Sequence, residues 1–69
     1  MKEIKSGINY IELKIYTDIL DESGIKFVVR ENDIVAPYFG GINTYNILVE
    51  DDDYNIAMSI INNNEREDQ

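Results

Sequence analysis

The chain has 69 residues and a net charge of −8, with 14 acidic and 6 basic side chains, so it is long enough for one domain. Its Lys and Arg residues are scattered, which argues against a nucleic-acid partner and against an anionic membrane surface. It contains no Cys and no His, so the thiolate nucleophile and the usual general base are missing, and we expect a protein that is not an enzyme and binds no cofactor.

The N-terminal third predicts a short strand, at 2–5, followed by a helix. Asn9 and Glu12 have the spacing of a capping box, in which each side chain accepts a hydrogen bond from an unpaired backbone N–H. Gly24 stands where a helix often ends on a left-handed residue, so we place the helix at 10–23. Its apolar face is expected to carry three isoleucines with two further apolar side chains beside them: Ile11, Ile15 and Ile19, with Tyr16 and Leu20.

The second half predicts two more strands and a second helix. Runs of β-branched and aromatic residues give strands at 25–30 and 45–50. The acidic run that follows begins a helix, in which Asp51 or Asp52 is expected to cap the first turn. Apolar residues at i, i+3, i+4 and i+7 form the face of this helix that packs on the core: Tyr54, Ala57, Met58 and Ile61.

The predicted order β-α-β-β-α indicates an α+β fold. Two helices on one face of a three-stranded sheet make a two-layer sandwich, in the arrangement of a ferredoxin-like fold that lacks its last strand. The strand at 45–50 is expected to be central, and the first strand to lie at an edge that is open to pairing with another chain. We expect a single domain over 1–62 and a polar tail at 63–69 that frays.

Three stretches give the chain a family resemblance: "ILDESGI" at 19–25, "VVREN" at 28–32 and "ILVEDDDYNIAMSII" at 47–61. Through them it resembles the small bacterial family of unknown function described as "putative prokaryotic signal transducing protein", whose fold is considered PII-like. The resemblance implies the fold above and a role in signalling. PII proteins bind nucleotides, but this chain has no Gly-rich phosphate motif followed by Lys, so we do not extend nucleotide binding to it. Ile56 departs from the family pattern, which usually has a charged residue there.

The connection at 31–44 is long and apolar for a loop. Its aromatic and β-branched residues predict an ordered segment. In one interpretation Ile34, Val35 and Phe39 fold back over the open face of the sheet and enlarge a small core. In the other, exposed apolar residues contact a partner: Tyr38, Phe39 and Ile42, together with Ile56 on the second helix.

Two sets of charged residues could each bind an ion or have only a structural role. The run at 50–53 could ligate Mg²⁺ or Ca²⁺, but consecutive side chains at a helix start do not converge on one ion, so capping is favoured and no metal is expected. Lys26 and Arg30 could hold an anion at one end of the sheet, although solvated charges on an edge strand are the more common outcome.

The sequence therefore predicts a small protein-interaction or signal-relay module that acts on an unidentified protein through the 31–44 loop and a sheet edge. The alternative is a small-molecule sensor with a pocket between that loop and the sheet. We also expect a weak homodimer, built on the edge of the first strand or on the face that carries Ile56, because a small core gains from burial against a second copy. With no signal-peptide pattern and no long apolar run, we expect a cytoplasmic protein.

Overall fold

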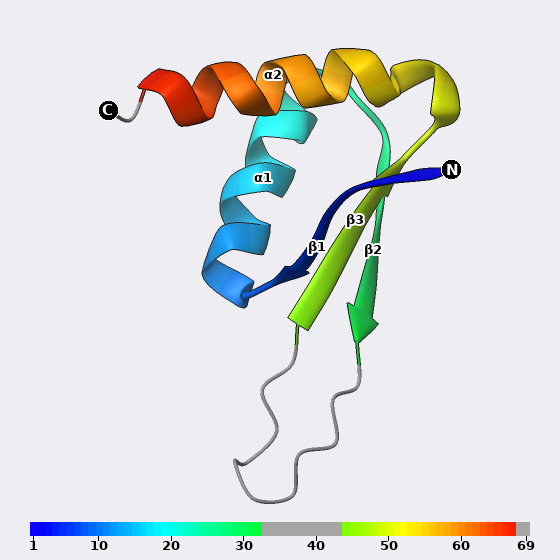
Figure 1. Cartoon of the computed structure of the whole chain (residues 1–69), viewed down its shortest axis with the longest axis vertical. Coiled ribbons are helices and arrows are strands. Elements are labelled where there is room, and N and C mark those ends of the chain that lie inside the picture. The colour runs from blue at the N-terminus through cyan, green and yellow to red at the C-terminus, as the bar shows by residue number, and fades with distance from the viewer. Residues whose placement is uncertain (33–43, 68–69) are drawn as a thin grey trace, which may run out of the picture.

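The computed structural model describes residues 1–32 and 44–67, which form a three-stranded sheet and two helices (Figure 1). In chain order the elements are β1 (Lys2–Ile8), α1 (Tyr10–Glu22), β2 (Phe27–Asn32), β3 (Thr44–Val49), the 3-10 turn η1 (Asp51–Asp53) and α2 (Tyr54–Glu67). The predicted order of strands and helices is confirmed.

The central strand of the sheet is β3, which pairs antiparallel with both of its neighbours, so the strand order is β1-β3-β2. β1 and β2 are therefore the two edges. Side chains of both helices share one core with Ile47 and Val49 of β3, so the helices cover the same face of the sheet. The chain is an α+β two-layer sandwich with a ferredoxin-like layout, as predicted.

Helix α1 is capped at both ends. At its start Asn9 Oδ1 accepts from the Glu12 N–H at 2.8 Å and the Glu12 side chain accepts from the Asn9 N–H at 3.5 Å, so the predicted capping box is present. At its end Gly24 has a φ of +74°, and the Ile25 N–H donates to the Leu20 carbonyl at 3.0 Å, in the pattern of a Schellman cap. Because Ile25 belongs to this cap, β2 begins later than the predicted start at 25.

Replacing Gly24 by alanine should destabilise the protein by roughly 1–2 kcal/mol, because a residue with a Cβ disfavours the left-handed conformation. Apart from Gly24 and its two chain neighbours, no heavy atom of the described residues lies within 4 Å of the position that the Cβ would take, so the effect should be conformational and not steric. Gly24→Asn should be less harmful, since Asn tolerates this conformation better. Urea denaturation would measure both differences, and an unchanged midpoint for Gly24→Ala would contradict the left-handed cap.

The apolar face of α1 differs in part from the prediction. Leu20 is buried, as predicted, but so is Leu13, whereas Ile11 is 71% and Ile15 53% exposed. At 100° per residue Ile15 lies roughly 160° from Leu13, on the other side of the helix. The helix is turned this way because Leu13 packs in the core together with Ile8, the residue before the cap, as in a hydrophobic staple.

Helix α2 runs across one end of α1 and the sheet (Figure 1). Its predicted core face is confirmed, since Ala57 and Ile61 are completely buried and Tyr54 and Met58 are half-buried against the same core. Ile56 lies away from that face and is 56% exposed. α2 continues to Glu67, into the stretch that the sequence assigned to the tail.

The acidic run before α2 does not act as predicted. Neither Asp51 nor Asp52 caps a helix through its side chain; both lie inside η1, whose first residue is preceded by Glu50 with no side-chain capping bond. The turn closes through its backbone, where the Asp53 N–H donates to the Glu50 carbonyl at 2.9 Å. Asp51 lies 3.3 Å from the terminal ammonium of Met1 instead. The acids therefore act through charge, at the positive end of the helical segment.

Candidate functional site

The face of the sheet opposite the helices carries a polar network centred on Asn46. Asn46 Oδ1 accepts from the backbone N–H of Gly7 at 3.0 Å and from Asn32 Nδ2 at 2.8 Å, and Asn46 Nδ2 donates to Glu3 Oε2 at 3.0 Å. Asn32 Nδ2 also lies 3.3 Å from Thr44 Oγ1. A single side chain of β3 thus joins all three strands.

The outer edge of β1 is irregular. The register between β1 and β3 shifts twice, between Glu3 and Lys5 and between Lys5 and Ile8. Gly7 lies in the second shift with a φ of +63°, the conformation of a glycine at a β-bulge. Bulges bend a strand and interrupt its regular backbone, so β1 is a poor template for an additional strand.

Two lysines of β1 lie over tyrosine rings of the helices. Lys2 Nζ is 5.1 Å from the ring centroid of Tyr54 in α2, and Lys5 Nζ is 4.9 Å from that of Tyr16 in α1. These cation–π contacts keep positive charge at the border of the core along β1. Bulges and lysines are both means by which natural sheets protect an edge, so the predicted open edge at the first strand is less suited to pairing than its position suggests.

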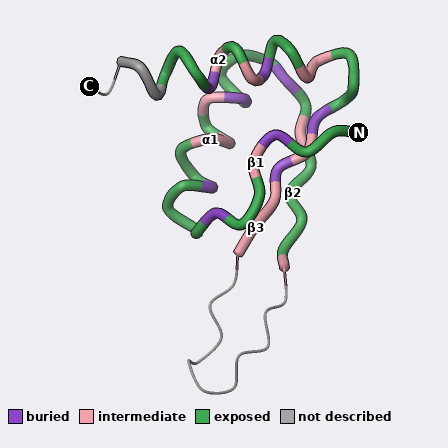
Figure 2. Tube along the Cα trace, in the orientation of Figure 1, coloured by how far each residue is buried: buried purple, intermediate pink, exposed green. Residues whose placement is uncertain are grey.

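The outer edge of β2 is regular and exposed. Its six residues, 27–32, pair with β3 without a register shift. The residues at 28–31 are all exposed, among them Val28 and Val29 on opposite faces of the strand, and Figure 2 shows this exposure along most of β2. Within the described sheet, the backbone groups of β2 that point away from β3 pair with no other strand. β2 therefore presents a ready template for an added strand.

A positive and an apolar side chain lie two residues apart on the open face of β2. Arg30 pairs in register with Asn46, which places it on the face opposite the helices, and Val28 lies on the same face. Lys26 is the residue just before β2. Neither Lys26 nor Arg30 forms an ion pair with another described residue. At about 3.3 Å per residue their backbones are roughly 13 Å apart, too far to hold one small anion together.

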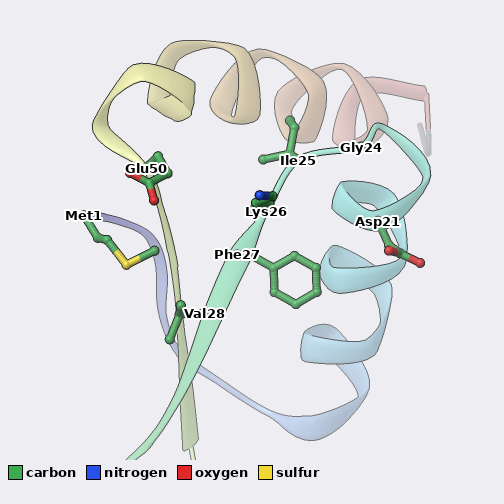
Figure 3. Close-up of a pocket in the computed structure, with 8 residues that line it drawn as sticks. All are labelled: Met1, Asp21, Gly24, Ile25, Lys26, Phe27, Val28 and Glu50. Atoms are coloured by element: carbon green, nitrogen blue, oxygen red, sulfur yellow. The ribbon is translucent and has the colours of Figure 1, made fainter.

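An open hollow of about 570 Å³ lies beside the first half of β2 (Figure 3). Met1, Val28 and Glu50 border it from the open face of the sheet, and the ring of Phe27 lies on the side of α1. The hollow is at the end of the sheet where β2 begins and β3 ends, remote from Asn32 and Thr44. The pocket predicted between the loop and the sheet falls on residues that the structure does not describe.

The predicted partner residues Tyr38, Phe39 and Ile42 lie outside the described residues, whereas Ile56 is described and exposed. In the ranges 1–32 and 44–67, no three acidic, His or Cys side chains are grouped so as to hold a metal ion. None of the described helices is long and apolar enough to cross a membrane.

Sequence reasoning did not single out Asn46, Asn32 or the exposed edge of β2. Alternation along 45–50 does indicate that Asn46 lies on the face opposite Ile47. The partners of Asn46 are 14, 39 and 43 positions away in the chain, so only the register of the three strands reveals the network.

The model of one protein family, described as "putative prokaryotic signal transducing protein", matches residues 1–65. The chain belongs to this family. The match spans nearly all of the described fold and confirms the resemblance seen in the three sequence stretches. No curated protein and no solved structure matches the chain.

Proposed function

We propose that this chain is a small non-enzymatic protein-interaction or signal-relay module, in which a partner protein pairs with an edge of the sheet. The observation that carries the proposal is β2, a regular six-residue edge strand that is exposed on both faces. Addition of an extended segment to such an edge is a recurrent mode of recognition. The family description, which names a signal-transducing protein, supports a relay role. The 31–44 loop continues directly from β2 and is proposed as the second contact.

A role without catalysis is favoured by the chemistry of the open face. Of its polar side chains, Glu3 and Asn32 are each hydrogen-bonded to Asn46, so these three groups are at least partly engaged with one another. The sequence has no Cys or His to serve as nucleophile or base near neutral pH.

A small-molecule sensor is the second candidate, and the hollow beside β2 is the feature that favours it. Ligand pockets usually enclose most of the ligand and bring several polar groups together. This hollow has three charged side chains at its border, Asp21, Lys26 and Glu50, but it is open to solvent and would not enclose a small ligand. A protein partner is therefore the better fit.

Affinity capture from the native cell tests the proposal. The wild-type chain should retain a specific protein, and retention should fall when 34–42 is deleted, if the loop is the second contact. The deletion leaves Asp33 and Asn43 between β2 and β3, a connection as short as a two-residue hairpin turn. Circular dichroism would verify that the shortened protein folds. Failure of the folded wild-type chain to retain any protein would overturn the proposed function.

Self-association is a separate prediction. Ile56 is 56% exposed on α2, and we propose a weak homodimer built on this face, because the edge of β1, the other surface expected from the sequence, is bulged and less suited to pairing. Sedimentation at rising concentration should show the mass increasing from 8.0 kDa towards twice that value. Ile56→Lys should weaken the association if the helix face is used and leave it unchanged if the strand edge is used, with Asn55→Lys as a control at the adjacent exposed position. A strict monomer at the highest concentration would contradict both versions.

A further inference from the structure

We propose that the outer edge of β2 binds an extended segment of a partner protein in which apolar and acidic residues alternate at every second position, so that both lie on one face of the segment. The inference rests on the proposed function and deepens it, because it names the edge that is used and the chemistry of the segment. It depends on the backbone of β2, on the charges of its open face and on the hollow beside it.

The backbone distinguishes β2 from the other edge. β1 has two register shifts against β3, and a straight segment could not follow its outer edge without bending. β2 follows β3 over six consecutive pairs without a shift, so its outward N–H and C=O groups are evenly arranged. Exposed valines on both faces of β2 would be covered by an added strand. A partner that adds to this sheet should therefore choose β2.

The charges on β2 define the partner segment. In an added strand, side chains on the open face recur at every second residue and lie opposite those of β2. The residue two positions from an apolar residue opposite Val28 then faces Arg30, where a carboxylate forms a favourable cross-strand pair. Lys26 lies just before β2, and Asp21 and Glu50 border the hollow together with it, so Arg30 should contribute most. The net charge of −8 repels an acidic segment. Charges farther away than the screening length, about 8 Å at physiological ionic strength, contribute little to this repulsion.

The same charges argue against a second copy of this chain on the β2 edge. A twofold antiparallel pairing of β2 with itself must be centred on one residue. Centring on Val28 places Lys26 opposite Arg30, and centring on Arg30 or Glu31 places two identical charges opposite each other. Centring on Val29 leaves each arginine opposite a valine. Like charges that face each other across strands are destabilising, and none of these registers places an opposite charge against Arg30, so an acidic segment suits this edge better than a second copy.

The hollow gives the segment room for one bulky apolar side chain. It borders Val28 and Met1 on the open face, and both of these side chains are largely exposed (Figure 3). A side chain that faces Val28 from an added strand would lie beside this hollow and cover them. Burial of these apolar surfaces adds a favourable contribution that the backbone pairing alone does not supply.

Two synthetic peptides of about nine residues test the proposal on the intact protein. In one, valine and glutamate alternate at every second residue, so that both lie on the same face of the strand, and in the other lysine replaces each glutamate. In an NMR titration the acidic peptide should shift the amide resonances of 26–32 and slow hydrogen exchange of the outward amides of β2. A version of the acidic peptide that is methylated on the amide nitrogens facing β2 should not bind, because it cannot donate to the strand.

A charge reversal sharpens the test. Arg30→Glu should weaken binding of the acidic peptide about 3- to 10-fold and strengthen binding of the basic peptide by a similar factor. Lys14→Glu, at an exposed position of α1, makes the same change in net charge and should alter neither peptide's affinity appreciably. Arg30 is exposed, so the variant should fold, and circular dichroism would verify this.

Four results would overturn the inference. In the NMR titration these are amide resonance shifts centred on β1, equal binding of the two peptides, or no binding at millimolar peptide. The fourth is a concentration-dependent dimer of the protein that protects the β2 amides from exchange. If a protein captured from the cell by the wild-type chain is retained equally by Arg30→Glu, the inference fails while the proposed function stands. If no protein is captured at all, the proposed function itself fails.

Discussion

Replacing Leu20 by alanine should leave a large part of the protein unfolded at room temperature. Leu20 is completely buried, and truncation of such a leucine costs about 2–5 kcal/mol. At about 0.05–0.15 kcal/mol per residue, a chain of this length has a free energy of unfolding of roughly 3–10 kcal/mol. One substitution can therefore remove most of it. Far-UV circular dichroism and urea denaturation would measure the loss, and Leu20→Met, which keeps most of the volume, should lose less than about 1.5 kcal/mol.

The matched control lies on the same helix. Ile15→Ala removes a side chain that is 53% exposed, so its effect should stay within about 0.5 kcal/mol. Both variants replace a four-carbon side chain by alanine in α1, which makes their helix propensities comparable. If Ile15→Ala proved as damaging as Leu20→Ala, the observed orientation of α1 against the sheet would be wrong.

The ends of α1 could be predicted from the sequence because the forces that set them are local. Asn9 and Glu12 satisfy each other's backbone N–H groups three positions apart, and Gly24 closes the helix within one turn. No information about distant residues is needed for such caps. The order of strands and helices was predictable for a similar reason, since each element has its own periodicity.

The buried face of α1 could not be predicted in the same way. Ile11, Ile15 and Ile19 recur every four residues and are strongly apolar, so the spacing of apolar residues favours their face. The structure buries Leu13 with Leu20, because these two residues meet a core formed with β3 and α2. A helix with two apolar stripes leaves the choice to contacts that are distant in sequence. The stripe left outside is exposed, as surface isoleucines often are.

The candidate site was harder still to predict, because it depends on strand register. The predictions concentrated on the 31–44 loop, whose composition is unusual, and on Ile56, which breaks a family pattern. The irregular edge of β1 and the regular edge of β2 look alike in sequence, since both are short runs of mixed polar and apolar residues. The difference arises from the two shifts of β1 against β3, one of which is accommodated by Gly7.

Asn46→Leu should destabilise the protein by about 1–3 kcal/mol, although leucine has the same number of side-chain heavy atoms and a higher hydrophobicity. The substitution removes the acceptor for the Gly7 N–H and for Asn32 Nδ2, and the donor to Glu3. Asn32 is half-buried, so its amide would lose a partner where water has limited access. Urea denaturation would give the change in the free energy of unfolding. Hydrogen exchange should also quicken at the Gly7 amide, which is a local readout of the bulge.

Two further variants separate the network from simple surface polarity. Glu3→Gln keeps a side-chain oxygen that accepts from Asn46 Nδ2, so its stability should remain close to that of the wild type. Asn55→Leu makes the same chemical change at an exposed position of α2, where no comparable network is present, and should have an effect within about 0.5 kcal/mol. A wild-type midpoint for Asn46→Leu, with unchanged exchange at Gly7, would show that the bulge of β1 holds without its contact to β3. The bulge that protects the edge of β1 would then depend on the backbone conformation of Gly7 and not on its hydrogen bond to Asn46.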